Sequence, residues 1–143
     1  MKRYVILALA MAGSAAIAHS DVKDPNVQKR MAGMKDMAAQ MKTLGAMSKG
    51  KSAFDASAAN AALAVISTQA ARIPALFEIK ADDPQSEALP RIWADHDTFT
   101  NHARRLNEAA ETLTGTVQQK SELGRAVKQL GRACRSCHET FKD

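Results

Sequence analysis

Apolar residues recur in steps of three and four along residues 21–143, and the chain has no run that alternates between apolar and polar positions. Steps of three and four keep side chains on one face of an α-helix. Four stripes of this kind are present: Val27, Met31, Met34, Ala38, Met41, Gly45 and Ser48; Ala59, Leu63, Ile66, Ala70 and Ile73; Phe99, Ala103, Leu106, Ala110 and Leu113; and Leu123, Val127, Leu130, Cys134, Cys137 and Phe141. The pattern predicts an all-α protein with four main helices.

The residues around the first two stripes predict where those helices begin and end. Asp24 followed by Pro25 is a typical helix start, and Asp55 is a second N-cap residue. Gly50 is expected to end the first helix, and Pro74 is expected to kink or end the second. Four helices pack most simply as an antiparallel four-helix bundle. The longest connection, over residues 78–90, predicts a crossover or a segment that contacts a ligand.

Residues 1–20 have the character of a secretory signal peptide. Lys2 and Arg3 precede an apolar run over residues 4–11, which is too short to span a bilayer, and small residues follow. We therefore expect an exported, periplasmic protein whose domain covers residues 21–143, with no membrane span after the signal is removed. An N-terminal anchor or an ordinary buried helix is the alternative interpretation of residues 1–20.

The charge of the expected domain is only mildly basic. Without Lys2 and Arg3, the 20 Lys and Arg residues of the chain fall to 18 against 15 Asp and Glu, so the net charge falls from +5 to +3. Both signs are interspersed, and one Trp and one Tyr cannot alternate with basic residues along a surface. This composition argues against a nucleic-acid partner.

The strongest chemical motif is Cys-Arg-Ser-Cys-His at residues 134–138. It is the attachment pattern of c-type haem, in which two thiols bind the cofactor covalently and the adjacent imidazole ligates the iron. At about 100° per residue, Cys137 lies roughly 60° behind Cys134 on a helix and His138 roughly 40° ahead, so all three share one side. That side coincides with the fourth apolar stripe, which predicts a haem inside the bundle.

The sequence supports three other uses of Cys134 and Cys137 less well than haem attachment. A disulfide between them would close a very short loop and stabilise little. A thioredoxin-like thiol pair is expected at a helix N-terminus, where the dipole lowers the thiol pKa, whereas these cysteines come at the end of the last stripe. Zinc would need a further ligand such as His96 or His102, which we expect at the surface.

The sixth coordination position of the iron decides between electron transfer and the binding of small gases. The first predicted helix carries Met31, Met34, Met37 and Met41, and a thioether is a soft, neutral ligand that keeps the iron six-coordinate. Methionines also fill irregular gaps in ordinary cores, which is the alternative interpretation.

At these motifs the sequence resembles the cytochrome c′ family, whose members are four-helix bundles with covalent haem near the C-terminus. The resemblance covers essentially the whole predicted domain. Its most specific part is Gly-Arg-Ala-Cys-Arg-Ser-Cys-His-Glu-Thr-Phe-Lys at residues 131–142. Further matches are Pro-Arg-Ile-Trp at 90–93, Arg-Met-Ala-Gly-Met-Lys at 30–35 and Leu-Gly-Ala-Met-Ser-Lys-Gly at 44–50.

The resemblance assigns roles to particular residues. Met34 matches the position over the distal face of the haem, where classical members carry an apolar residue that does not ligate and a low-spin branch carries methionine. The chain resembles that low-spin branch, with Met31 or Met37 as alternative ligands. Arg30 matches a position near a haem propionate, with a solvated helix arginine as the alternative interpretation.

The same resemblance brings Ser86 and Glu87 to the haem edge. Lys142 departs from the family, because many members carry arginine behind the proximal histidine. Any role of that arginine in gas binding therefore does not transfer to this chain.

The resulting expectation is a periplasmic electron carrier, and not an enzyme, that contains one haem c ligated by His138 and Met34 and works with redox partner proteins. Members of the family often pair through the first two helices, so a homodimer is compatible with the sequence. The alternative function is a five-coordinate cytochrome c′ that binds nitric oxide or carbon monoxide. A third hypothesis is a haem-free helical binding module whose cysteines serve redox or metal chemistry.

Overall fold

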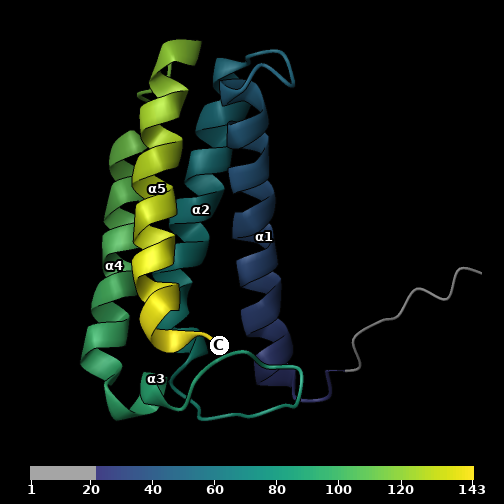
Figure 1. The fold of residues 1–143 in the computed structure, drawn as a ribbon, viewed down its shortest axis with the longest axis vertical. Helices are drawn as coiled ribbons and strands as arrows, with labels where there is room; N and C mark the ends of the chain where they lie inside the picture. Colours follow the sequence, from purple (N-terminus) through teal and green to yellow (C-terminus); the bar gives the residue numbers. More distant parts are fainter. Residues whose placement is uncertain (1–21) are drawn as a thin grey trace, which may run out of the picture.

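The computed structural model describes residues 22–143, and over that range it is helical without β-strands. Within these residues the chain forms four long helices and one short one, which can be followed in Figure 1. Their bounds are α1 Pro25–Ser48, α2 Ala56–Leu76, α3 Arg91–Ala94, α4 His96–Leu113 and α5 Lys120–Phe141. The predicted signal peptide, residues 1–20, lies outside the described residues. None of the helices within residues 22–143 is long and apolar enough to cross a membrane.

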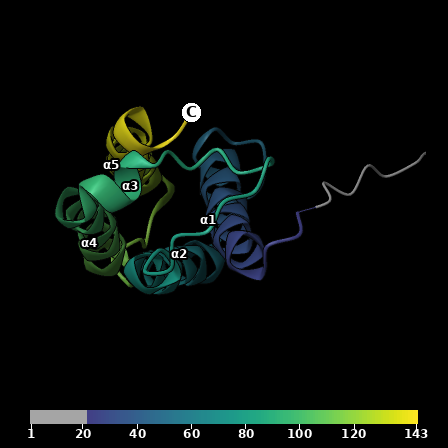
Figure 2. The same ribbon diagram turned by 90° about the horizontal axis from the view of Figure 1, so that it is seen from below.

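The four long helices form an antiparallel bundle, which confirms the predicted fold class. Viewed from below, they occupy four corners in the order α1, α2, α4, α5, so that each packs against the next and α5 packs back against α1 (Figure 2). α2 lies diagonally across the bundle from α5. This order places the last helix beside the first, although more than 70 residues separate them along the chain.

Side-chain caps fix the helix starts at the predicted positions. The Asp24 carboxylate accepts hydrogen bonds from the backbone N–H groups of Asn26 and Val27, at 2.7 and 3.1 Å, and Asp55 accepts one from Ala58 at 2.9 Å. These carboxylates satisfy N–H groups that have no partner within the helix. Gly50 follows the end of α1 with a φ of +70°, a conformation that glycine adopts without a steric penalty.

Pro74 does not end α2, and one short helix was not expected from the sequence. α2 passes through Pro74 and continues to Leu76, because a proline removes only one backbone hydrogen bond and the Phe77 N–H still bonds to the Ile73 carbonyl at 3.2 Å. The short helix α3 was not predicted. It is a single turn, and four residues are too few to show a hydrophobic period.

The stripes of α2, α4 and α5 lie in the core almost as predicted, whereas the stripe of α1 does not. The buried apolar residues of the core are centred on Leu44, Leu63, Ile66, Leu123 and Leu130. On α1 the buried face is offset by about one residue from the predicted stripe, and its members are Val27, Arg30, Gly33, Met37, Leu44 and Met47. The prediction that Met31 and Ala38 are core residues is therefore wrong, since both are exposed.

The long connection between α2 and α3 crosses the lower end of the bundle, where it passes near the start of α1 and the end of α5 (Figures 1 and 2). The buried Asp83 carboxylate accepts hydrogen bonds from the backbone N–H groups of Lys23 and Asp24, at 2.9 and 3.4 Å. Near its other end, the Leu89 N–H donates to the Phe141 carbonyl at 3.0 Å. The connection thus ties both ends of the described chain to one end of the bundle.

The core explains a first prediction about stability. Leu63 is fully buried, whereas Val65, two residues away on the same helix, is 37% exposed. Leu63→Ala should lower the free energy of unfolding by about 2–5 kcal/mol, because it removes buried methyl groups and leaves a cavity. Val65→Ala should change it by no more than about 0.5 kcal/mol. Guanidinium denaturation followed by circular dichroism measures both, and equal effects would contradict this description of the core.

Candidate functional site

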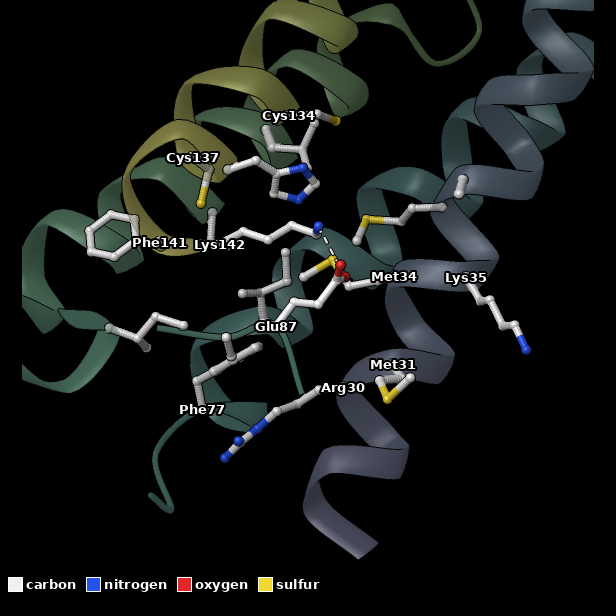
Figure 3. Close-up of a pocket in the computed structure, with 18 of the residues that line it drawn as sticks. Arg30, Met31, Met34, Lys35, Phe77, Glu87, Cys134, Cys137, Phe141 and Lys142 are labelled. Carbon is white, nitrogen blue, oxygen red and sulfur yellow. Dashed lines mark ion pairs between the residues drawn. The ribbon is translucent and has the colours of Figure 1, made fainter. Parts of the chain in front are cut away.

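A cavity of about 890 Å³ lies between α1 and α5, toward the lower end of the bundle. Side chains of α1, α4 and α5 and of the long connection line it, and most of them are apolar. Figure 3 shows the two helices on either side of this space, with the long connection below. The volume is within the range of roughly 300–1,000 Å³ that is typical of small-molecule and cofactor sites.

Cys134, Cys137 and His138 line this cavity from α5. In Figure 3 both cysteines project from the same stretch of the helix, and the two thiols are not joined by a disulfide. Burial raises the pKa of the Cys134 thiol, and burial together with the charge of Cys134 raises the pKa of Cys137 to about 11. The helix period therefore brings the three predicted residues together on one wall.

The His138 side chain is exposed, and its surroundings lower the pKa of its imidazole, which favours the neutral form. Desolvation is the largest cause that lowers its pKa, and the nearby Lys142 ammonium lowers it further, while the Glu87 carboxylate opposes both. A neutral imidazole nitrogen is the form that can ligate a metal. The wall formed by α5 thus offers two thiols and one neutral nitrogen.

The opposite wall is formed by the methionines of α1. Met31, Met34, Met37 and Met41 all line the cavity, but they differ in burial. Met31 is 36% exposed, Met37 is packed in the core with 6% exposed, and Met34 is half-buried between these extremes. In Figure 3 Met34 extends from α1 toward α5, whereas Lys35 points away from the cavity. Of the three methionines predicted as possible iron ligands, only Met34 is neither packed in the core nor exposed at the surface.

Arg30 is buried at the lower end of the cavity, with 3% of its surface exposed, so the interpretation as a solvated helix arginine is wrong. Its guanidinium donates to three backbone carbonyls at and beyond the end of α2: Leu76 at 2.8 Å, Ala81 at 3.1 Å, and Ile79. The same group lies 4.5 Å from the centroid of the Phe77 ring and 5.3 Å from that of Trp93. Arg30 thereby fastens the long connection to α1, and its contact with a haem propionate stays a prediction.

Ser86 and Glu87 also line the cavity, and both belong to a segment that is fixed to the C-terminus. The Glu87 carboxylate forms an ion pair of 3.0 Å with the Lys142 ammonium, drawn as a dashed line in Figure 3. The Glu87 carbonyl accepts a hydrogen bond from the Asp143 N–H at 2.9 Å, and Ala88 forms an isolated bridge with Lys142. These contacts hold the predicted loop residues against the end of α5.

The expectation of a surface position for His102 is wrong. It is half-buried on α4, lines the cavity, and lies edge-on to Phe141, with 5.9 Å between the ring centroids. Its Nδ1 is 3.3 Å from the Ser136 hydroxyl. His102 follows Phe99 by three residues, so the helix period predicts a position beside the apolar stripe of α4.

The chemistry of these residues fits a haem better than a bare metal ion. Between Val22 and Asp143, no group of three or more His, Cys, Asp and Glu side chains is placed to hold a metal ion by itself. A haem instead brings its own equatorial nitrogens, so it needs only axial ligands and attachment points from the protein. The cavity offers two thiols, an imidazole and, on the opposite wall, a thioether.

Known proteins resemble the chain over this whole region. A family model described as "Cytochrome C′" matches residues 25–142. Cytochrome c-556 of Rhodopseudomonas palustris is 33% identical over all of this chain and 98% of its own length. A cytochrome c′ of the same organism is 32% identical over 96% of this chain and 92% of its own. The solved structure of a cytochrome c′ from R. palustris superposes with a TM-score of 0.77 at 30% identity, over 85% of this chain and 98% of that one.

The buried guanidinium gives a second prediction. Arg30→Ala should lower the free energy of unfolding by about 2–4 kcal/mol, because three carbonyls lose a charged donor. Arg30→Lys should recover only part of this, since an ammonium cannot reproduce the planar fork. Arg72→Ala, an exposed arginine on α2, is the matched control and should have little effect. Amide exchange in residues 77–82 should accelerate in Arg30→Ala, and unchanged exchange there would contradict the anchoring role.

The raised thiol pKa values give a third prediction, for the folded chain without cofactor. Only the thiolate reacts with iodoacetamide, so at pH 8 Cys137, whose pKa is about 11, should be alkylated at least about tenfold more slowly than in guanidinium-unfolded chain. The difference should shrink as the pH rises toward 11. Peptide mass spectrometry measures the rates, with folding checked by circular dichroism. Equal rates at pH 8 would show a reactive thiol and favour the redox hypothesis.

Proposed function

We propose that this chain, which belongs to the cytochrome c′ family and is therefore a haem c cytochrome, carries single electrons through a haem ligated by His138 and Met34. The observation on which the proposal depends is the position of Met34, half-buried on the wall of the cavity opposite the cysteines and the histidine of α5. When bound, the haem supplies one-electron redox chemistry at its iron.

In this proposal α5 both attaches and ligates the cofactor. Cys134 and Cys137 bind it covalently, and His138 provides the proximal nitrogen. The shared side of the helix supports this assignment, because all three residues line one cavity. The C-terminal residues support this arrangement, because the Glu87–Lys142 ion pair of 3.0 Å ties the long connection to the end of α5.

The thioether of Met34 is proposed as the sixth ligand. Met37 is less suited, because it is packed in the core, and Met31 is less suited, because it is the most exposed of the three. A ligand present in both redox states keeps the iron six-coordinate, which favours electron transfer over gas binding. The apolar lining contributes too, since low dielectric and excluded water tune the redox potential.

The alternative is a five-coordinate cytochrome c′ that binds nitric oxide or carbon monoxide, in which Met34 only packs against the cofactor. A relative named cytochrome c′ is about as similar to this chain as the relative named cytochrome c-556, so overall similarity does not separate the two functions. Six-coordination is favoured by the methionine at position 34. In the family that the sequence resembles, methionine at this position is typical of the low-spin branch.

The cellular setting that we propose is the periplasm, with export directed by residues 1–20. The chain would receive an electron from one redox partner protein and pass it to another, without transforming a substrate. Arg30, Ser86 and Glu87 are proposed to border the cofactor at the lower end of the cavity, and their presence in the lining supports this. A homodimer paired through α1 and α2, which are neighbours in the bundle (Figure 2), is compatible with this function.

The ligand assignment gives a fourth prediction. The ferric wild-type protein should be low-spin and show a methionine-to-iron charge-transfer band, and Met34→Ala should abolish that band and make the iron high-spin. Met31→Ala and Met37→Ala are the matched controls and should keep the band. Met34→Ala should also bind carbon monoxide in the ferrous state more readily than the wild type.

The opposite outcome is equally measurable. A wild-type ferric spectrum that is already high-spin, together with rapid carbon monoxide binding when reduced, would reject the electron carrier in favour of the gas-binding alternative. Loss of the band in Met31→Ala but not in Met34→Ala would move the ligand to Met31. Protein produced with a haem-attachment system but lacking covalent haem would reject both cytochrome functions.

A further inference from the structure

We propose that an acidic region of a redox partner protein docks on the outer face of α5, on a basic stripe formed by Arg125, Lys128, Arg132 and Arg135. The inference rests on the proposed electron-carrier function, for which it names a surface and the chemistry of the partner. All four side chains are exposed, and they follow one another in steps of three, four and three. At about 100° per residue these steps place them within a sector of about 80° on one side of the helix.

The basic stripe faces away from the bundle. Leu123, Ala126 and Leu130 are the buried residues of the same stretch, and by the helix period they lie on the other side of α5. α5 occupies a corner of the bundle, between α1 and α4, so its outer side has no helix packed against it (Figure 2). The stripe is thus an open surface rather than part of a packing interface.

Most of the positive charge of the stripe is not neutralised by the residues that the structure describes. Among residues 22–143, none of the four side chains forms an ion pair or a side-chain hydrogen bond, although Lys142 and Arg104 are paired with Glu87 and Glu108. The Glu122 carboxylate of α5 interacts electrostatically with Arg125, at the N-terminal end of the stripe, and offsets part of its charge. Glu122 accepts hydrogen bonds from the backbone N–H groups of Gln118 and Gln119 at the start of the helix.

Glu139 is the one carboxylate on the same side, one turn beyond Arg135. The stripe therefore carries an excess of positive charge, which attracts an acidic surface and speeds its encounter with α5.

The stripe lies on the helix that carries the proposed attachment site. Cys134 and Cys137 line the cavity on the inner side of α5, so a partner on the outer side is separated from the cofactor by this single helix, about 10 Å across. The exchange transfers one electron: the reduced molecule loses it, the oxidised molecule gains it, and no bond is made or broken. A docking site here would bring the two redox centres close together.

An anionic membrane is a less suitable occupant than a protein. Helices that bind membranes place a large apolar face in the lipid while basic residues remain in the headgroup region. The apolar face of α5 is instead buried in the bundle, through residues such as Leu123, Leu130 and Phe141. The outer face offers charge without an apolar side chain to insert.

The test measures how fast the ferrous holoprotein is oxidised by ferricyanide, an anionic one-electron oxidant, and by tris(phenanthroline)cobalt(III), a cationic one. At about 0.1 M ionic strength charges act over roughly 10 Å, so the rates report on the local surface. Lys128→Glu/Arg132→Glu should slow the oxidation by ferricyanide about threefold or more and should speed the oxidation by the cobalt complex. Lys128→Gln/Arg132→Gln should give intermediate rates, which separates lost charge from any distortion by glutamate.

The matched control is Lys51→Glu/Arg72→Glu, which changes the net charge equally at exposed positions outside α5. Its rates should stay within about twofold of the wild type. Poly-L-glutamate, as an acidic polypeptide probe, should inhibit the oxidation of the wild type and of this control by ferricyanide, but not that of Lys128→Glu/Arg132→Glu.

Other outcomes would overturn the inference. If the two charge-reversed variants are oxidised at equal rates, the docking inference is overturned and the electron-carrier proposal is not, because electron exchange would then be independent of the stripe. Binding of the wild type to phosphatidylglycerol vesicles at about 0.1 M salt, lost in Lys128→Glu/Arg132→Glu, would make the stripe a membrane-binding surface instead. A wild-type protein that exchanges electrons with neither oxidant would overturn the electron-carrier proposal together with this inference.

Discussion

The site depends on the 3.6-residue period of α5. A spacing of three residues and then one on a helix brings Cys134, Cys137 and His138 to the same wall of one cavity. The same period leaves the opposite side of the helix for exposed, mostly basic residues. α5 can therefore hold a cofactor inside the bundle and present charge outside it, with about 10 Å between the two surfaces.

The cavity requires α1 to face α5 without filling the space between them. The long connection makes this arrangement stable at the lower end, because it is anchored by Arg30 to α1 and by the backbone of Leu89 to Phe141 at the end of α5. A buried arginine is costly to desolvate, and here its cost is offset by three carbonyl acceptors and two aromatic rings. Polar contacts thus close the end of an otherwise apolar site.

The sequence predicted what repeats over many residues or follows from short motifs. The bundle, the helix starts and the cavity-facing side of α5 are confirmed, since hydrophobic periods and caps act locally. The role of Arg30 was not predictable, because its acceptors lie some 50 residues further along the chain and come near it only in the fold. The stripe of α1 was assigned to the core for a related reason. Its Met31 and Ala38 line the cavity, and periodicity alone does not distinguish the wall of a cavity from a core.

The central claim is that one iron is bound by a nitrogen from α5 and a sulfur from α1 across this cavity. Iron X-ray absorption spectroscopy of the ferric holoprotein tests it most directly, because it counts the atoms bound to the metal and distinguishes sulfur from nitrogen. We expect five nitrogens and one thioether sulfur around the iron, and the sulfur should be absent in Met34→Ala. An iron surrounded by five nitrogens alone in the wild type would contradict it.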